Sequence, residues 1–219
     1  MQDIKEALFE NEEFIAMLSH DLKTPVKAQI RAINLLKTNF RNEFSDELFD
    51  LILNLDASNK YMQCLLDNVL CDFRINRNKF VLNKKENDIR KTIEEVLSNI
   101  GILFEVKNQK IEVNYLASNF IKSYDDIEIQ RVLVNLLSNA FNYAKENSTI
   151  KLNINSELEK LKIEIISHTK VQDLFSCNLK NKANFGLGLI ICEKIIKFHN
   201  GEFITKIKDG YFQAVFCIP

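Results

Sequence analysis

Two long stretches of helical periodicity limit what the first third of this chain can fold into. In the first stretch, apolar residues recur every three or four positions, as they do on one face of an α-helix. They are Phe14, Leu18, Leu22, Val26, Ile30, Ile33 and Leu36. In the second stretch, steps of four and three alternate as in a coiled-coil seam. Its members are Leu48, Ile52, Leu55, Asn59, Met62, Leu66, Val69 and Phe73.

The two predicted helices are joined by a short polar stretch from Asn39 to Asp46, which predicts a helical hairpin. A hairpin alone buries little apolar surface, so we expect two hairpins to pair into a dimeric four-helix bundle. Asn59 occupies a core position of the second seam, where a single Asn can fix register and oligomeric state. The alternative is that the hairpin packs on the C-terminal part of its own chain; seams along most of both helices favour the dimer.

The polar face of the first helix carries a titratable imidazole. At ~100° per residue, His20 lies about 200° from the nearest apolar positions, so it points to water. Thr24 is one turn further on the same side, and Asp21 can orient the imidazole or take its proton. Pro25 lacks a backbone donor and should bend the helix just past the histidine.

A plainer interpretation of this region is a solvated helix face, with a new helix that starts at Thr24–Pro25. The run from Ser19 to Pro25, SHDLKTP, also resembles the phosphoacceptor box in the dimerising domain of sensor histidine kinases. That resemblance implies that His20 is phosphorylated and that Asp21 assists as a base. It also implies that Thr24 aligns the water that dephosphorylates a response regulator.

Beyond the polar segment from Arg74 to Lys79 the periodicity changes, so we place a domain boundary near residue 78, with domains at 1–78 and 79–219. Alternating and helical patterns predict strands at 80–82, 110–115, 150–155, 161–166, 202–207 and 212–218, and helices at 88–98, 129–144 and 187–199. Strands separated by helices indicate one sheet covered by helices on one face. The predicted fold class is α + α/β, a helical hairpin followed by an α/β sandwich.

Three asparagines follow one face of the predicted helix around residue 135. Asn135, Asn139 and Asn142 fall at i, i+4 and i+7, although asparagine is a mediocre helix former. Carboxamide oxygens suit a hard cation and carboxamide NH2 groups suit phosphate, so the stripe could hold Mg²⁺ beside a triphosphate. The alternative is that an Asn-rich chain simply exposes asparagines.

The run from Arg131 to Tyr143, RVLVNLLSNAFNY, resembles the N-box of histidine kinase ATPase domains. The resemblance implies that Asn135 ligates magnesium and that Asn139 contacts phosphate or adenine. Asn142 and Tyr143 fall in the same box and are expected to bind the nucleotide.

Two of the five glycines lie just before the last predicted helix, in Gly186-Leu187-Gly188-Leu189. Glycines at such a junction let backbone N–H groups approach an anion at the positive helix end. Tight packing of helix on strand is the alternative, and Gly201 is expected to cap the helix at its C-terminus. The run resembles the second glycine box of the same ATPase domain, which implies that residues Gly186, Leu187, Gly188 and Leu189 bind ATP.

One box of that family is missing. The family carries Asp-x-Gly-x-Gly after a strand, where the Asp accepts the adenine amino group; this chain has Ser167-His168-Thr169-Lys170-Val171. In that family a lid segment with a pair of aromatic residues follows this box, and Phe175 is what remains of the pair in this chain. Loss of the acceptor is expected to cost about 1.5–3 kcal/mol, or roughly ten- to a hundredfold in affinity. His168 is expected to be a surface residue at the strand end.

Composition narrows the function classes. The 219 residues carry a formal net charge of -1 and no basic block, which argues against a nucleic-acid or polybasic membrane surface. No apolar run is long enough to span a bilayer and the N-terminus is polar, so we expect a soluble, cytoplasmic chain. The cysteines lack CxxC spacing and are expected to be reduced and structural. They are Cys64, Cys71, Cys177, Cys192 and Cys217.

Together the resemblances imply a two-component histidine kinase that uses ATP and Mg²⁺, phosphorylates His20 and passes the phosphoryl group to an aspartate of a response regulator receiver domain. The chain is expected to be either a soluble kinase that senses through a partner or a cytoplasmic fragment of a longer protein. Because the Asp box is absent, a phosphotransfer or phosphatase docking module with an impaired ATPase domain is the alternative. A third, purely structural dimeric scaffold would be indifferent to substitution of His20.

Overall fold

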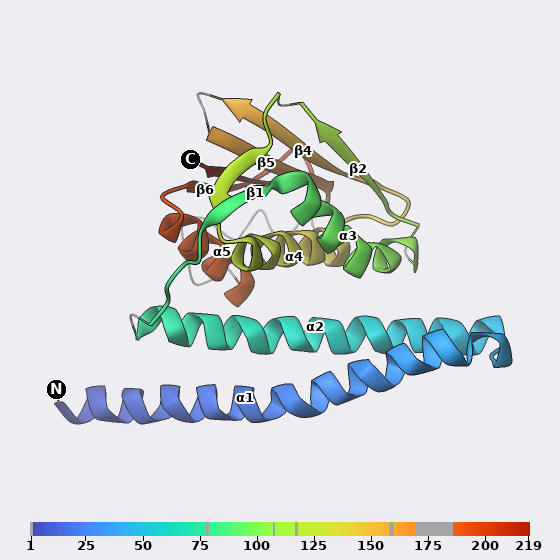
Figure 1. Cartoon of the computed structure of the whole chain (residues 1–219), viewed down its shortest axis with the longest axis horizontal. Coiled ribbons are helices and arrows are strands. Elements are labelled where there is room, and N and C mark those ends of the chain that lie inside the picture. The colour runs from blue at the N-terminus through green and yellow to red at the C-terminus, as the bar shows by residue number, and fades with distance from the viewer. Residues whose placement is uncertain (1, 78, 107, 117, 158–159, 170–185) are drawn as a thin grey trace. The chain divides into compact units, whose positions relative to one another are not determined.

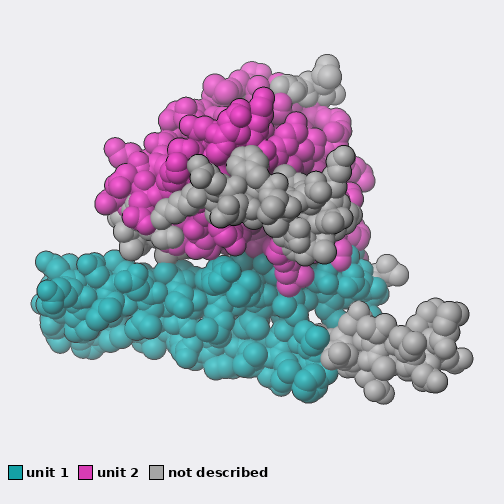
Figure 2. All heavy atoms as spheres, turned by 180° about the vertical axis from the view of Figure 1, so that it is seen from behind, with its two compact units in different colours: residues 1–80 teal, residues 81–219 magenta. Residues whose placement is uncertain are grey.

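The computed structural model describes residues 2–77, 79–106, 108–116, 118–157, 160–169 and 186–219. The chain divides into two compact units, Met1–Phe80 and Val81–Pro219, coloured separately in Figure 2. The first is helical and the second contains both helices and strands, in agreement with the predicted fold class.

Two long helices form the first unit. They are α1 (Gln2–Asn39) and α2 (Asp46–Asn76), and the connection between them holds a short 3-10 helix, η1 (Arg41–Glu43). The Ser45 side chain caps α2 by accepting a hydrogen bond from the Leu48 N–H, at 3.3 Å. Because α1 runs through Pro25 as one helix (Figure 1), the alternative of a helix start at Thr24–Pro25 is wrong.

Ion pairs join α1 to α2 along the hairpin. Lys23 pairs with Asp67, and Lys37 Nζ lies 2.7 Å from Asp56 Oδ2. The same Asp56 oxygen is 3.1 Å from Lys60 Nζ, one turn further along α2. The Asp56 carboxylate is 6% exposed, so two ammonium groups neutralise a carboxylate that has been taken out of water.

The predicted apolar seams are only partly covered within one chain. Val26 and Ile33 of α1 and Ile52 of α2 are buried, as the helical period predicts. Large seam residues remain exposed, namely Phe14, Leu18, Leu22, Leu36, Leu48, Leu55 and Met62, at 38–56%. The carboxamide of Asn59 donates to the Leu55 carbonyl at 3.0 Å, so it bonds its own helix here. In a single hairpin, these seam residues therefore form an exposed apolar surface of the kind that normally packs against a partner.

The second unit is built on a five-stranded mixed sheet in the order β2-β4-β5-β7-β6. The strands are β2 (Lys110–Tyr115), β4 (Thr149–Glu157), β5 (Lys160–His168), β7 (Tyr211–Ile218) and β6 (Glu202–Lys208). The pair β2 and β4 is parallel and the other pairs are antiparallel. All five lie where the sequence pattern predicts strands.

Two smaller strands, β1 (Lys85–Asp88) and β3 (Ile121–Tyr124), form a separate antiparallel pair. The prediction of one sheet is therefore wrong, and so is the predicted strand at 80–82. Residues 81–84 form no strand and Val81 is 77% exposed, so the short apolar run on which the prediction rested is not a buried strand.

Three helices cover one face of the five-stranded sheet (Figure 1): α3 (Ile89–Val106), α4 (Asp126–Tyr143) and α5 (Leu187–Phe198). In β5 every second residue, Leu161, Ile163 and Ile165, is fully buried beneath them. The opposite face is polar, and there Glu164 accepts hydrogen bonds from Asn153 and Gln213. No helix in the described part of the chain is long and apolar enough to cross a membrane.

We expect Asp56→Asn to lower the free energy of unfolding of the helical unit by about 3 kcal/mol, because it leaves the largely buried Lys37 ammonium without its counter-charge. The matched control is Asp46→Asn on the same helix, where the paired carboxylate is 94% exposed and the loss should stay below about 1 kcal/mol. Urea unfolding followed by far-ultraviolet circular dichroism measures both. Equal losses would contradict the role assigned to burial.

Candidate functional site

His20 lies on the solvent face of α1, as its position in the helical period predicts. Its side chain is 77% exposed, and Nδ1 lies 3.3 Å from Asp21 Oδ1. Because an ionised carboxylate only accepts, this contact places the ring proton on Nδ1 and leaves the Nε2 lone pair for chemistry. Thr24, one turn away, is also exposed. The neighbouring Ser19 is buried instead, and its hydroxyl donates to the Ile15 carbonyl at 2.8 Å.

The asparagine stripe lies along α4 and runs from the interior to the surface. Asn135 is 5% exposed, Asn139 is half-buried, and Asn142 and Tyr143 are exposed at the end of the helix. The helix begins at a polar cap, where the Asp125 carboxylate accepts the Glu128 N–H. The four residues therefore share one helix but differ in depth.

The glycine loop meets the asparagine stripe at the start of α5. Gly186 is the N-cap of this helix, and a Cβ built on Gly188 would lie 3.4 Å from Asn135 Oδ1. The structure thus brings together two predicted site elements that are about 50 residues apart in the sequence. Leu187 and Leu189, in the first turn, are half-buried. Residues 184 and 185, which belong to the same predicted box, lie outside the described residues.

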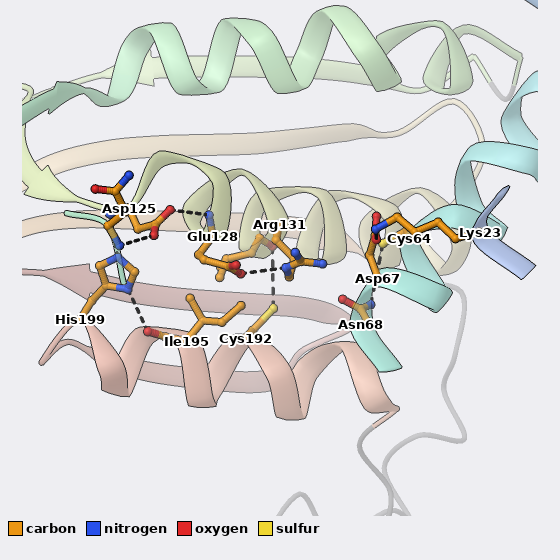
Figure 3. A network of polar contacts seen from close by, with 12 residues as sticks. Lys23, Cys64, Asp67, Asn68, Asp125, Glu128, Arg131, Cys192, Ile195 and His199 are labelled. Carbon is orange, nitrogen blue, oxygen red and sulfur yellow. Dashed lines mark hydrogen bonds and ion pairs between the residues drawn. The ribbon is translucent and has the colours of Figure 1, made fainter. Parts of the chain in front are cut away.

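The contact between α4 and α5 is antiparallel and repeats along both helices. After the Gly188–Asn135 contact, Cys192 Sγ lies 3.8 Å from the Val132 carbonyl oxygen, and His199 then meets the first residues of α4. Each step forward on α5 is matched by a step of similar size backward on α4, and Figure 3 shows the part of this contact that holds Cys192 and His199. One axial register therefore relates the two helices between the Gly188–Asn135 contact and the His199–Asp125 contact.

The predicted C-cap at Gly201 is wrong in detail. His199 caps α5, and the left-handed residue that follows is Asn200, with φ 60°. Gly201 serves a different purpose, because a Cβ there would lie 2.0 Å from the Cys217 carbonyl oxygen of β7. Close approach of two backbone segments explains the glycine.

The end of β5 is where the missing Asp box would lie. Ser167 is 2% exposed, and Thr169 is bridged to Ala144 while its hydroxyl donates to the Tyr143 carbonyl at 3.3 Å. His168 faces the other way and stacks on Tyr211 with ring centroids 4.8 Å apart. Ser167 thus points to the helix side of the sheet next to the end of α4. Lys170, Val171, Phe175 and Cys177 lie outside the described residues.

The donor set decides which metal the site could hold. Among the described residues no cluster of three His, Cys, Asp or Glu side chains is placed to hold a metal ion. The carboxamide oxygen of Asn135 lies beside the glycine loop, and an oxygen ligand of this kind suits a hard cation that keeps most of its ligands from water and phosphate. The residues present therefore fit Mg²⁺ bound together with a phosphate group.

A buried hydrogen-bond network, which no sequence pattern indicated, holds the start of α4. The Thr92 hydroxyl is 2.5 Å from Asp126 Oδ1 and 2.7 Å from the Tyr124 hydroxyl. Burial raises the pKa of Tyr124 to about 12, so this phenol stays protonated and donates to Thr92, which in turn donates to Asp126. The network ties α3 and β3 to the first turn of α4.

Residues 124–218 match the family described as Histidine kinase-, DNA gyrase B-, and HSP90-like ATPase. Sensor protein RprX of Bacteroides fragilis is 30% identical over 205 residues, which cover 86% of this chain and 39% of RprX. The chain is a relative of the sensor histidine kinases. The adaptive-response sensory kinase SasA of a Nostoc species is 28% identical over 222 residues, which cover 90% of this chain and 55% of that kinase. The chain thus spans about half or less of the length of these relatives.

Solved histidine kinase structures share the fold. The catalytic domain of histidine kinase ThkA is 25% identical, with a TM-score of 0.53, and the match covers 63% of this chain and 95% of that domain. Full-length ShkA in complex with AMPPNP has a TM-score of 0.64 at 18% identity, over 94% of this chain and 45% of ShkA. The resemblance that the sequence motifs predicted is confirmed at the level of family and fold, while the roles of individual residues stay predictions.

We expect Gly188→Ala to raise the free energy of unfolding of the second unit by about 0.5 kcal/mol. Alanine is the better helix former, and its Cβ would make an ordinary contact with Asn135. Gly201→Ala should lower it by about 3 kcal/mol, because the β7 backbone must move away. Thermal unfolding of the two variants tests this. If Gly188→Ala instead lowered the free energy of unfolding strongly, close packing against Asn135 would by itself explain why this position is a glycine.

Proposed function

We propose that this chain is the phosphoacceptor and ATPase portion of a two-component histidine kinase. In this proposal, residues 1–78 provide the dimerisation and phosphoacceptor hairpin, and residues 79–219 bind Mg-ATP. The observation that carries the proposal is the apposition of Gly188 to Asn135, since it joins the asparagine stripe to a helix N-terminus suited to phosphate. The family matches support the same assignment.

The reaction proposed for His20 follows from its tautomer. The Nε2 lone pair attacks the γ-phosphorus of ATP, the bond from that phosphorus to the bridging oxygen breaks, and ADP leaves. Positive charge then develops on the ring, and Asp21, 3.3 Å from Nδ1, stabilises it or takes the Nδ1 proton. The phosphoryl group passes next to an aspartate of a response regulator, and His20 returns to its starting state.

Binding of the nucleotide is assigned to residues at the facing ends of α4 and α5. Asn135 would ligate Mg²⁺, which neutralises charge on the phosphates, and Asn139 would contact phosphate or adenine. Asn142 and Tyr143 are exposed at the end of α4, where they can meet the ligand from outside. Backbone N–H groups of the turn from Gly186 to Leu189 would bind the phosphates.

Two partners belong to the proposal. A second copy of the chain would cover the exposed seam residues of α1 and α2, which gives a four-helix bundle and a homodimer. A response regulator receiver domain would receive the phosphoryl group. In support, a histidine kinase of the same fold, ThkA, has been solved in complex with response regulator protein TrrA, and that structure matches this chain at 21% identity. We place the reaction in the cytoplasm.

The second candidate function is a phosphotransfer or phosphatase module that binds a response regulator but turns over little ATP. Ser167 at the end of β5 favours it, because a hydroxyl replaces the carboxylate that would accept the adenine amino group. His20 and Thr24 would serve this function equally well, so nucleotide turnover separates the two candidates.

Incubation with Mg²⁺ and γ-labelled ATP is expected to give acid-labile, base-stable label on the wild-type chain and none on His20→Ala. His168→Ala is the matched control, because His168 is the other histidine with solvent access and lies in the second unit. Label that persists in His20→Ala would disprove the phosphoacceptor assignment. No label on any variant, together with transfer from a phosphorylated regulator to His20, would favour the phosphotransfer module.

We expect Ser167→Asp to tighten binding of Mg-ATP by roughly ten- to a hundredfold, because it restores a buried acceptor for the adenine amino group. His168→Asp adds the same charge one residue along, on the opposite face of β5, and should not tighten binding. Calorimetric titration of both variants against wild type measures the effect. Equal affinities for Ser167→Asp and wild type would mean that the base does not reach the end of β5.

A further inference from the structure

We propose that His199 is a positioning residue that sets the axial register of α5 on α4 and thereby holds Gly188 against Asn135. It lies at the far ends of both helices from that contact, so it would act at a distance of about 16 Å, the length of eleven helical residues. The part of the proposal that concerns nucleotide affinity rests on the proposed function; the part that concerns register does not.

The bonding of His199 admits a single protonation state. The side chain is 1% exposed; Nε2 is 3.0 Å from the Asp125 backbone nitrogen and Nδ1 is 2.9 Å from the Ile195 carbonyl oxygen. A backbone N–H can only donate and a carbonyl can only accept, so Nδ1 carries the proton and Nε2 is the acceptor. A proton on Nε2 would face the Asp125 N–H directly, and the contact would be lost.

Asp125 extends the contact to a third segment of the chain. While its N–H donates to His199, its carboxylate caps α4 and accepts the Asn83 N–H at 2.6 Å. Figure 3 shows His199 directed at Asp125, with Ile195 on its other side. The His199 ring therefore joins the end of α5 to the start of α4, and Asp125 joins the segment before β1 to the same junction.

Because α4 and α5 meet in one register, the contact between His199 and Asp125 affects the position of Gly188 relative to Asn135. Between His199 and Gly188, Cys192 Sγ lies 3.8 Å from the Val132 carbonyl oxygen, which is a weak polar contact. Apolar side chains tolerate small axial shifts, whereas two hydrogen bonds to one rigid ring do not. His199 thus supplies the directional restraint that apolar packing lacks.

Charged side chains from two segments of the chain face the ring. Lys84 from the segment before β1 and Asp125 and Glu128 from α4 face it, and their effects oppose one another. Burial lowers the pKa of His199 below its ordinary value, and the hydrogen bond to Ile195 offsets this in part. An unfolded chain binds this proton more readily, so stability conferred by His199 is complete above about pH 6.5 and declines as the pH falls below it.

The test uses the isotope-labelled full chain and follows the Gly188 amide and Asn135 side-chain resonances by NMR, with Mg-ATP affinity measured in parallel. His199→Phe keeps a planar aromatic ring but removes both hydrogen bonds. We expect it to displace both sets of resonances and to weaken Mg-ATP binding by about tenfold. Lys197→Gln, an exposed neighbour on α5, is the control and should leave the resonances and the affinity unchanged.

His199→Gln tests the same idea without loss of hydrogen bonding, since its amide offers one acceptor and one donor but does not titrate. It should keep the wild-type resonances of Gly188 and Asn135 and the wild-type affinity. Unchanged Gly188 and Asn135 resonances in folded His199→Phe would overturn the inference, as would resonances displaced as far in His199→Gln as in His199→Phe. If no variant, wild type included, binds Mg-ATP, the proposed function fails while the resonances still decide the role of His199.

Discussion

The packing of α4 against α5 is the contact on which the candidate site depends. The asparagine stripe belongs to one helix and the glycine loop to the other, and neither helix presents a nucleotide site by itself. Both lie on the same face of the sheet, where α4 packs on β5 and α5 packs on β6 and β7. A change in how these helices meet would therefore alter the site without touching any residue that contacts a ligand.

The helical unit has to meet two opposite requirements on one helix. The face of α1 that carries His20 is exposed, and the proposed function needs it to stay so, since a phosphoryl group would arrive and leave there. The seam on the other side leaves Phe14, Leu18 and Leu22 exposed in a single chain, and such surface normally finds a partner. In the proposed dimer, a second hairpin would cover the seam and leave the His20 face open. The ion pair of Lys37 with Asp56 fixes how the two helices of one hairpin meet.

Much of this could be predicted from the sequence because periodicity and motif spacing are local. Helical spacing placed α4, and a strict alternation placed β2 and β5. The pair β1 and β3 was missed, since Lys85–Asp88 has no apolar alternation and takes its partner from a distant segment. Periodicity also shows which side chains share a face without showing what covers it, as the exposed seam residues demonstrate. A buried histidine such as His199 looks the same in sequence as an exposed one.

The position of β7 between β5 and β6 has a consequence for how the protein is made. On the ribosome, β5 emerges with one edge paired to β4 and the other open, and it stays so until β7, which follows every other strand in the sequence, has been synthesised. Such non-local pairing is slow and leaves an apolar edge exposed meanwhile. Ala214 and Phe216 are both fully buried in β7. Substitutions of either residue would therefore reduce the number of chains that fold in the cell more than they would change the properties of the chains that do fold.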